Sequence, residues 1–387
     1  MILSSRNKNT IAYIFTVIFS ILILFIANKH VSSGESVFHG SSNTINRAVV
    51  KTIVDKVESV REYDEETIVE STDIIFKATI RSGKFSGRNI TAVQTIDGFS
   101  YIQQKEVQTG DEVILSLTEV EESEYEWQFI DYLRSDKLIY LGILFVIVLI
   151  IFGRLKGLNT ILSLIFTCLA IFSVFIPAIL SGRNIYLWSV LTCVYIILST
   201  LLIVSGFNRK TLAAIAGCFA GIVMTASITL LMDNILILTG FLDENSLYIV
   251  NLPLQNTINL RGLVFAAIII GAMGAIMDVS VSIASSLWEI KSKVKSAGFN
   301  TLYSSGINIG RDIMGTMSNT LILAYIGGAL SLVILLTAYS TSPLELFNRE
   351  MIIAEVLKAL TGSFGILLTM PLTALVSGFL YTRIFKN

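Results

Sequence analysis

Residues 271–290 read GAMGAIMDVSVSIASSLWEI, and residues 310–320 read GRDIMGTMSNT. Polar side chains recur in both stretches at steps of three or four, which places them on one face of a helix. A carboxylate inside hydrocarbon costs about 3 kcal/mol or more, so such a face usually borders a bundle interior or a watery cavity. The stretches therefore predict two membrane helices, each with a polar face. The residues of these faces are Asp278, Ser282, Ser285 and Glu289, then Asp312, Thr316, Asn319 and Thr320.

The composition excludes an ordinary soluble protein. The 387 residues are 53% hydrophobic and 15% charged, and the mean hydropathy is +0.73. A net charge of -1 excludes a broadly basic surface that binds nucleic acid. The cysteines, Cys168, Cys193 and Cys218, all fall in apolar runs, so we expect neither a disulfide framework nor a metal site. These features predict an α-helical membrane protein that crosses the bilayer several times.

The first segment, residues 1–27, is predicted to be a cytoplasmic N-terminus followed by a signal-anchor helix. An apolar run from Thr10 to Ala27 follows Arg6 and Lys8, and its length is close to the ~20 residues that a spanning helix needs. A cleaved signal peptide is the alternative. The length of the run and the lack of a clear Ala-x-Ala sequence after it favour the uncleaved anchor.

Residues 28–136 have a different character and predict a small all-β sandwich or barrel outside the membrane. They are rich in Asp and Glu, and turn signals such as Asp97-Gly98 and Gly110-Asp111 separate short segments rich in β-branched residues. Because this segment is acidic, we expect it to avoid anionic lipid and nucleic acid. The predicted strands are Ala48–Val60, Thr72–Arg81, Asn89–Ile96 and Val113–Val120, with a further alternation at Tyr125, Trp127 and Phe129.

Residues 137–387 predict seven further membrane helices, which makes eight in total. Lysine and arginine gather in alternate loops, at Gly153–Asn159, Gly206–Thr211 and Glu289–Asp312. The positive-inside rule therefore places both termini in the cytoplasm and residues 28–136 outside. The segment Leu344–Leu360 predicts a helix lying flat on the outer leaflet. The expected spans are Leu138–Phe152, Ile161–Leu180, Tyr186–Ser205, Leu212–Thr239, Leu263–Ser286, Ile313–Ala338 and Gly362–Phe385.

Small residues predict close helix packing in two of these spans. Gly217 and Gly221 form a Gly-x-x-x-Gly pair, and Gly271 and Gly274 directly precede Asp278. Such spacing lets helix backbones approach each other, and it permits self-association without requiring it. Close packing at Gly271 and Gly274 would bring Asp278 to a junction between helices.

Two interpretations of Asp278 remain open. It could be a structural carboxylate, either paired with Arg311 or capping the helix start at Gly310-Arg311-Asp312, that specifies the fold. It could instead be a site that couples transport to a proton or cation. Asp312 could instead be favoured by a helix N-terminal dipole, and Asn319 needs a partner because an unpaired amide in hydrocarbon is costly. Glu289 and Lys291 lie at the cytoplasmic boundary, where we expect them to be snorkelled or solvated. Asp233 and Asn234 form a second-tier polar pair near the outer end of a span.

The sequence gives no support to an enzyme. Its membrane aspartates occur as Met277-Asp278 and Arg311-Asp312, which does not match the motif of intramembrane aspartyl proteases. A His-Glu-x-x-His zinc motif, a Walker loop and a Gly-x-Ser-x-Gly elbow are all missing from the sequence. We therefore expect no catalytic residue, no cofactor and no metal. A lipid-modifying enzyme would need a nucleophile that the sequence does not reveal.

Residues 274–289 and 310–325 resemble the YibE/F family of bacterial membrane proteins. The resemblance covers the membrane region from about Leu138 onward, and the additional N-terminal domain resembles the longer member of the pair in which these proteins are often encoded. It implies a bacterial cell-membrane location and a second, shorter membrane partner. It implies no established activity.

The function predicted from these features is that of a transporter or permease component for a small solute or ion. Asp278 and Asp312 would couple transport to protons, Arg311 would supply the counter-charge, and Ser282, Ser285, Thr316 and Asn319 would line the path. The alternative is an envelope scaffold or sensor that binds a partner or ligand through residues 28–136, without transporting anything.

Overall fold

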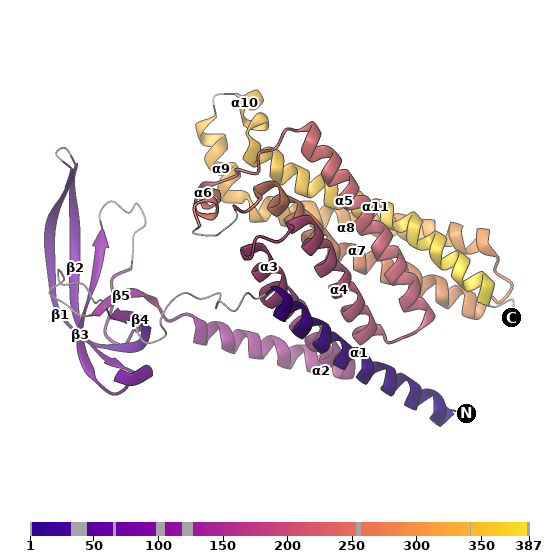
Figure 1. Ribbon diagram of the computed structural model, residues 1–387, viewed down its shortest axis with the longest axis horizontal. Helices are drawn as coiled ribbons and strands as arrows, with labels where there is room; N and C mark the ends of the chain where they lie inside the picture. Colours follow the sequence, from indigo (N-terminus) through magenta and orange to yellow (C-terminus); the bar gives the residue numbers. More distant parts are fainter. Residues whose placement is uncertain are drawn as a thin grey trace. The chain divides into compact units, whose positions relative to one another are not determined.

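The computed structural model describes residues 2–31, 45–64, 67–97, 105–117, 127–252, 257–340 and 342–384. The chain divides into two compact units. One consists of Met1–Glu35 together with Leu149–Asn387, and the other of Ser36–Val148. The first is helical and the second is built around a β-barrel (Figure 1).

The β-barrel closes in the strand order β1-β2-β3-β5-β4. Neighbouring strands are antiparallel except β3 and β5, which pair in parallel through Ala92 and Trp127. This order, with its one parallel pair, is the topology of the oligonucleotide- and oligosaccharide-binding barrel. The strands are β1 Ile45–Asp64, β2 Thr67–Ile80, β3 Asn89–Asp97, β4 Glu112–Leu117 and β5 Trp127–Tyr132, with a 3-10 turn, η1, at Gly83–Phe85.

Alternating side chains fill the barrel, as the period of a strand requires. Phe76, Ala78 and Ile80 on β2 are all buried, and Trp127 packs edge-on against Phe85 with ring centroids 5.4 Å apart. The prediction of a small β-rich domain is confirmed, in its barrel form. The end of the fourth predicted strand at residues 118–120, and Tyr125, lie outside the described residues.

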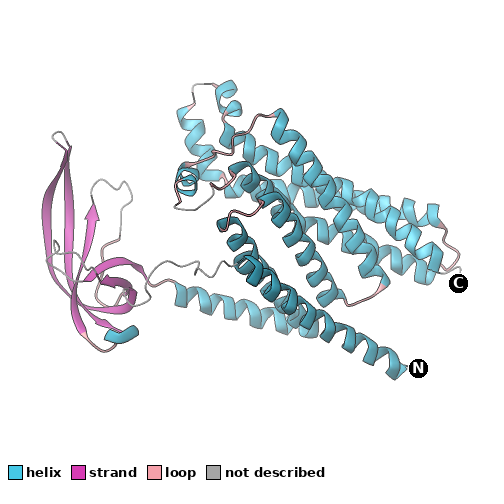
Figure 2. Cartoon of the chain, in the orientation of Figure 1, coloured by secondary structure: helices cyan, strands magenta, loops and turns pink. Residues whose placement is uncertain are grey.

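Figure 2 shows the helices in cyan. They include those of the helical unit, the part of α2 that belongs to the barrel unit, and the turn η1. Apart from η1, these helices are α1 Ile2–Val31, α2 Ser135–Ala170, the π-helical turn η2 Ile171–Phe175, α3 Ile176–Leu180, α4 Ile185–Ser205, α5 Arg209–Ile235, α6 Glu244–Val250, α7 Leu260–Lys293, α8 Phe299–Gly328, α9 Leu330–Tyr339, α10 Pro343–Asn348 and α11 Glu350–Ile384.

Within the described residues, six helices are long and apolar enough to cross a membrane. The number rises to seven if α8 and α9, which meet at 63°, form one span. This is compatible with a multi-pass membrane protein, but the predicted count of eight is not confirmed. The main difference is that two predicted spans, Leu138–Phe152 and Ile161–Leu180, fall within one 46-residue helical stretch, Ser135–Leu180. Its helix is interrupted at Arg154, which has φ 51° and ψ -130°.

The flat helix expected at Leu344–Leu360 is not present as a separate element. Pro343–Asn348 forms the short α10, and α11 then runs without a break from Glu350 through the last predicted span. The physical reason is burial, because the apolar side chains of this first part of α11 pack into the bundle. These are Ile352, Ala354, Leu357 and Ala359.

The bundle core holds a buried stripe of small and polar residues on α11. The stripe repeats every four residues and consists of Thr361, Gly365, Thr369, Thr373, Ser377 and Tyr381. The glycines of α5 pack against it, since a Cβ at Gly217 would overlap Thr373 and one at Gly221 would overlap Thr369. The Gly-x-x-x-Gly pair on α5 is therefore a packing motif.

Two threonine hydroxyls at this interface form hydrogen bonds within their own helices. Thr369 donates to the carbonyl of Gly365 at 2.6 Å, and Thr225 donates to the carbonyl of Gly221 at 2.9 Å. Each bond reaches back one helical turn. The interior of the bundle therefore accommodates these threonine side chains at little cost, whereas the buried Ser377 hydroxyl has no hydrogen-bond partner among the described residues.

Candidate functional site

The predicted polar face of α7 points away from the packed core. Asp278 is exposed, and Ser282 and Ser285 are half-buried. Gly271 faces α8, because a Cβ there would overlap the hydroxyl of Tyr325, whereas Gly274 faces open space. Only Gly271 of this pair therefore makes the close helix contact that the sequence predicts.

The polar face of α8 is also exposed. Its residues Arg311, Asp312, Thr316 and Asn319 all have exposed side chains. The opposite side of α8 is buried against α7 and α11, through Leu302, Gly306 and Gly310. The charged residues of α8 thus lie on the side away from the bundle.

The four most polar residues make no internal pairs. Within the described part of the chain, the side chains of Asp278, Arg311, Asp312 and Asn319 form no hydrogen bond or ion pair. The predicted internal pair of Asp278 with Arg311 is therefore not formed. Thr316 differs, because its hydroxyl donates to the carbonyl of Ile313 at 2.9 Å.

The contacts between α7 and α8 bring their polar residues to related heights. The helices run antiparallel, with Gly271 at Tyr325 and Leu287 at Gly306. Seven residues along each helix from the first contact, Asp278 is level with Ser318. The Ser318 and Tyr325 hydroxyls are both buried, and neither has a hydrogen-bond partner among the described residues. Such unpaired groups are uncommon in protein interiors. The contact between α7 and α8 therefore leaves two buried hydroxyls without a hydrogen bond.

Glu289 and Lys291, near the C-terminal end of α7, have different environments. Glu289 is exposed and pairs with Lys293 at 2.9 Å. Lys291 is only 5% exposed and donates to the carbonyls of Lys295 and Ala297, both at 2.7 Å. The expectation that Lys291 is solvated is wrong, because its ammonium group binds the carbonyls of the chain that follows α7.

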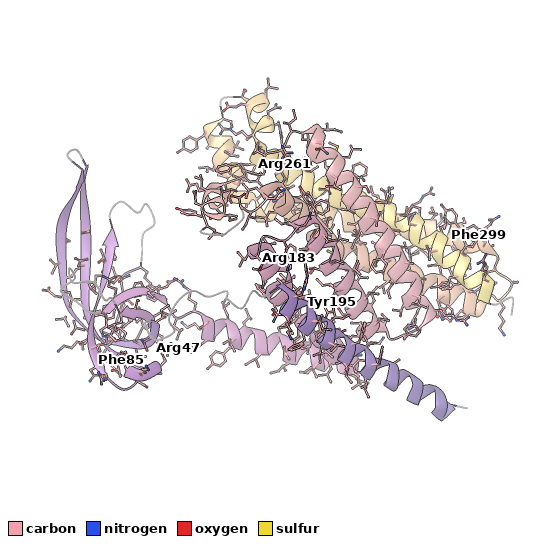
Figure 3. All side chains as sticks on the ribbon, viewed as in Figure 1. Arg47, Phe85, Arg183, Tyr195, Arg261 and Phe299 are labelled. Carbon is pink, nitrogen blue, oxygen red and sulfur yellow. The ribbon has the colours of Figure 1, made fainter. Side chains whose placement is uncertain are left out.

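The second-tier pair lies at the other end of the bundle. Asp233 is half-buried near Tyr186 and Arg261, and Figure 3 shows Arg261 and Phe299 at opposite ends of the helical unit. Asn234 is exposed and donates to the carbonyl of Leu230 at 3.0 Å. Neither residue comes close to the polar faces of α7 and α8 along the helix axis.

The loop after α5 is held by a carboxylate that the sequence analysis missed. Glu350 accepts from the backbone N–H groups of Thr239 and Gly240, at 2.6 and 2.7 Å, and from the Thr239 hydroxyl. Asp243 then caps α6 by accepting from the Ser246 N–H at 2.9 Å. Hydrogen bonds from the Asn245 and Ser246 side chains hold the pKa of Asp243 below its ordinary value of 3.8.

Residues 141–383 match the family model described as YibE/F-like protein, which is more than half of the chain. The chain belongs to the YibE/F family. The match runs from early in α2 to the end of α11 and confirms the resemblance of residues 274–289 and 310–325. The β-barrel lies outside it. No curated protein and no solved structure matches the chain.

The polar faces of this YibE/F chain do not form a metal site in the described residues, where no group of three or more His, Cys, Asp or Glu could hold a metal ion. The described parts also contain an apolar groove of about 700 Å³ between α1 and α4, where the Tyr195 hydroxyl donates to the Ser20 carbonyl at 3.3 Å (Figure 3). The groove contains none of the predicted site residues.

The α11 stripe is the feature that sequence reasoning missed. Its residues Thr361, Gly365, Thr369, Thr373 and Ser377 recur every four positions, which is a visible small-residue pattern. Charged residues drew attention to α7 and α8 instead. Inside the bundle, the stripe brings the Ser280 and Thr373 hydroxyls within 3.2 Å of each other.

Proposed function

We propose that this YibE/F protein is a transporter or permease component for a small solute or ion, coupled to protons through Asp278 and Asp312. The observation that carries the proposal is the polar face along α7 and α8, on which Asp278, Arg311 and Asp312 have no hydrogen-bond or ion-pair partner within the described residues. Groups left in this state are suited to bind water, protons or a solute.

Each polar residue has a role in this proposal. Asp278 and Asp312 take up and release the proton, and Arg311 supplies the counter-charge. Ser282, Ser285, Thr316 and Asn319 line the path, together with the orphan hydroxyls of Ser318 and Tyr325. Glu289 lies at the cytoplasmic entrance.

The transport unit crosses the membrane eight times in this proposal. The stretch Ser135–Leu180 would be about 69 Å long as one straight helix, more than twice the ~30 Å hydrocarbon core. Two crossings that reverse near Arg154 resolve the mismatch. A Cβ at Gly157 would overlap the carbonyl of Leu149, so the two arms touch beside the break.

The orientation follows from the loop charges. With α1 as an uncleaved anchor and with α8 and α9 as one span, both termini lie in the cytoplasm of a bacterial cell. Residues 28–136 then lie outside. A second, shorter YibE/F-like membrane protein is the partner that the family resemblance suggests.

Reconstitution tests the transport proposal. The chain, alone and with the shorter partner, is placed in vesicles that contain a pH-sensitive dye, and proton and solute flux are measured. Asp278→Asn and Asp312→Asn should each abolish coupled flux. Asp243→Asn is the matched control, because this aspartate lies outside the long helices and an asparagine can also cap α6. Flux that is indifferent to both test substitutions would remove the mechanism.

One observation favours a sensor or scaffold as the second candidate. Only Leu133 and Arg134 separate β5 from α2, and Arg47 on β1 forms an ion pair with Asp136 in the first turn of α2 at 3.2 Å. The barrel is therefore held tightly to a membrane helix, as signalling across a membrane requires. Deleting residues 31–135 separates the candidates, because a transporter core keeps residual flux and a sensor loses its whole phenotype.

A further inference from the structure

The exposed face of α8 has a defined centre. Gly306 marks the side that is packed against α7 and α11, and Gly315 is nine residues further along. At about 100° per residue, Gly315 points about 180° away from Gly306. A Cβ at Gly315 would meet nothing within 4 Å, so the centre of this face is open and nearly flat.

Opposite charges flank this centre. Arg311 precedes Gly315 by four residues and lies about 40° to one side, whereas Asp312 precedes it by three and lies about 60° to the other side. Asn308 lies within about 20° of the centre. All three side chains are exposed. The face thus has a cation on one flank and an anion on the other, at nearly the same height.

These charges lie deep in the bundle's apolar layer. Gly310 packs against Met370 on α11, and Met370 lies twelve residues after Lys358 and thirteen before Arg383. No charged residue occurs between those two cations. Arg311 and Asp312 are therefore about 20 Å from either end of this uncharged stretch. Facing lipid there would cost about 3 kcal/mol for each charge.

We propose that the face centred on Gly315 binds the same face of a second copy of this chain. A two-fold contact needs a surface that is complementary to itself, and this face satisfies that condition. With the two-fold axis parallel to the helices, Arg311 of one copy meets Asp312 of the other on each side of the paired Gly315 residues. The contact removes four charges from lipid as two neutral pairs.

This arrangement rests on the transport proposal in one respect only. If that proposal holds, Arg311 and Asp312 line a path shared by two copies. The dimer itself follows from the charges and the open face. It also explains why Arg311 and Asp312 have no partner among the described residues of one chain. Dimer formation and flux are therefore measured separately.

A charge-swap experiment tests the contact. Two differently tagged copies are co-expressed and co-purified. Arg311→Asp gives each copy two acidic residues on the face, and Asp312→Arg gives two basic residues. Each variant alone should lower co-purification by about tenfold or more, because like charges then meet. Co-expression of one variant with the other restores both opposite-charge pairs and should restore co-purification.

Cross-linking provides a second measurement that does not depend on charge. In a background with the three cysteines changed to serine, Asn308→Cys should form an inter-copy disulfide on oxidation. Val223→Cys on α5, a position that is 61% exposed, is the matched control and should not. Both proteins must show the same thermal unfolding as the parent.

The proposal is overturned if Asn308→Cys cross-links no more than Val223→Cys, or if the mixed charge variants do not recover. Cross-linking to a shorter membrane protein in place of a second copy also overturns it. A dimer without flux contradicts only the transport proposal, whereas flux from a monomer contradicts only this one.

Discussion

The stripes on α11 and α8 are both polar, but they face opposite environments. The α11 stripe, Thr361 to Tyr381, is buried among α5, α7 and α8, and its hydroxyls are small enough to fit beside glycines. The α8 face, Asn308 to Asn319, is exposed and carries two charges that have no partner within the described chain.

The difference lies in how each group satisfies its hydrogen bonds. A threonine hydroxyl in a helix can donate to a carbonyl one turn back, as Thr369 and Thr225 do, so it can be buried alone. A guanidinium or carboxylate has more bonds to make than its own helix can supply. In this bundle the buried stripe of α11 is therefore built from hydroxyl residues, whereas Arg311 and Asp312 lie on an exposed face of α8.

The largest expected effect comes from a matched pair of glycine substitutions. Gly221→Leu forces a side chain into Thr369 and should lower the free energy of unfolding by about 1–3 kcal/mol or more. Gly315→Leu meets open space and should leave the free energy of unfolding unchanged. The same substitution should weaken association between copies. Thermal unfolding in detergent measures the stability of both variants. Equal destabilisation would show that α8 is packed in the same way as α11.

A smaller effect is expected from Tyr381→Phe. The Tyr381 hydroxyl is fully buried and donates to the carbonyl of Ala284 at 3.0 Å. Its removal should cost about 1 kcal/mol, measured as a shift in thermal unfolding. Tyr248→Phe is the control, because that side chain is 73% exposed and should tolerate the change. A neutral Tyr381→Phe would contradict the view that the end of the α11 stripe is held by specific bonds.

The smallest effect is expected at Asp243, a polar residue outside the long helices. Asp243→Ala removes the cap of α6 and should cost about 0.5 kcal/mol, seen as faster hydrogen exchange of the Ser246 amide. Asp243→Ser should preserve the cap. The pKa of Asp243 is lowered, so the protection is present above the ordinary value of 3.8 and is lost as the pH falls through the lowered value. If the protection of the Ser246 amide, relative to its intrinsic exchange rate, does not change over that pH range, this role is excluded.

Much of the architecture could be predicted from periodicity. Segments of alternating residues such as Thr72–Arg81 became barrel strands, and the polar spacing of Asp278 and Asp312 did place each set on one helical face. The direction of that face could not be predicted, since a period of 3.6 fixes which residues share a side and not what lies opposite. That depends on the contacts of Gly306 and Gly310 with other helices.

Other features depended on tertiary packing or were overlooked. The break at Arg154 directly follows Gly153 and falls in the loop predicted at Gly153–Asn159. The extension of α11 back to Glu350, in contrast, depends on the burial of Ile352 and Leu357. The α11 repeat from Thr361 to Tyr381 was visible in the sequence. Hydroxyl residues cost little in a membrane helix, so their presence alone does not predict which face of the helix is buried.

The short connection between the barrel and α2 has a mechanical consequence. Two residues separate β5 from the helix, and Arg47 forms an ion pair with Asp136. The barrel therefore has little freedom to rotate relative to the first turn of α2. Any force applied to it is delivered as tilt or torque to the first turns of α2.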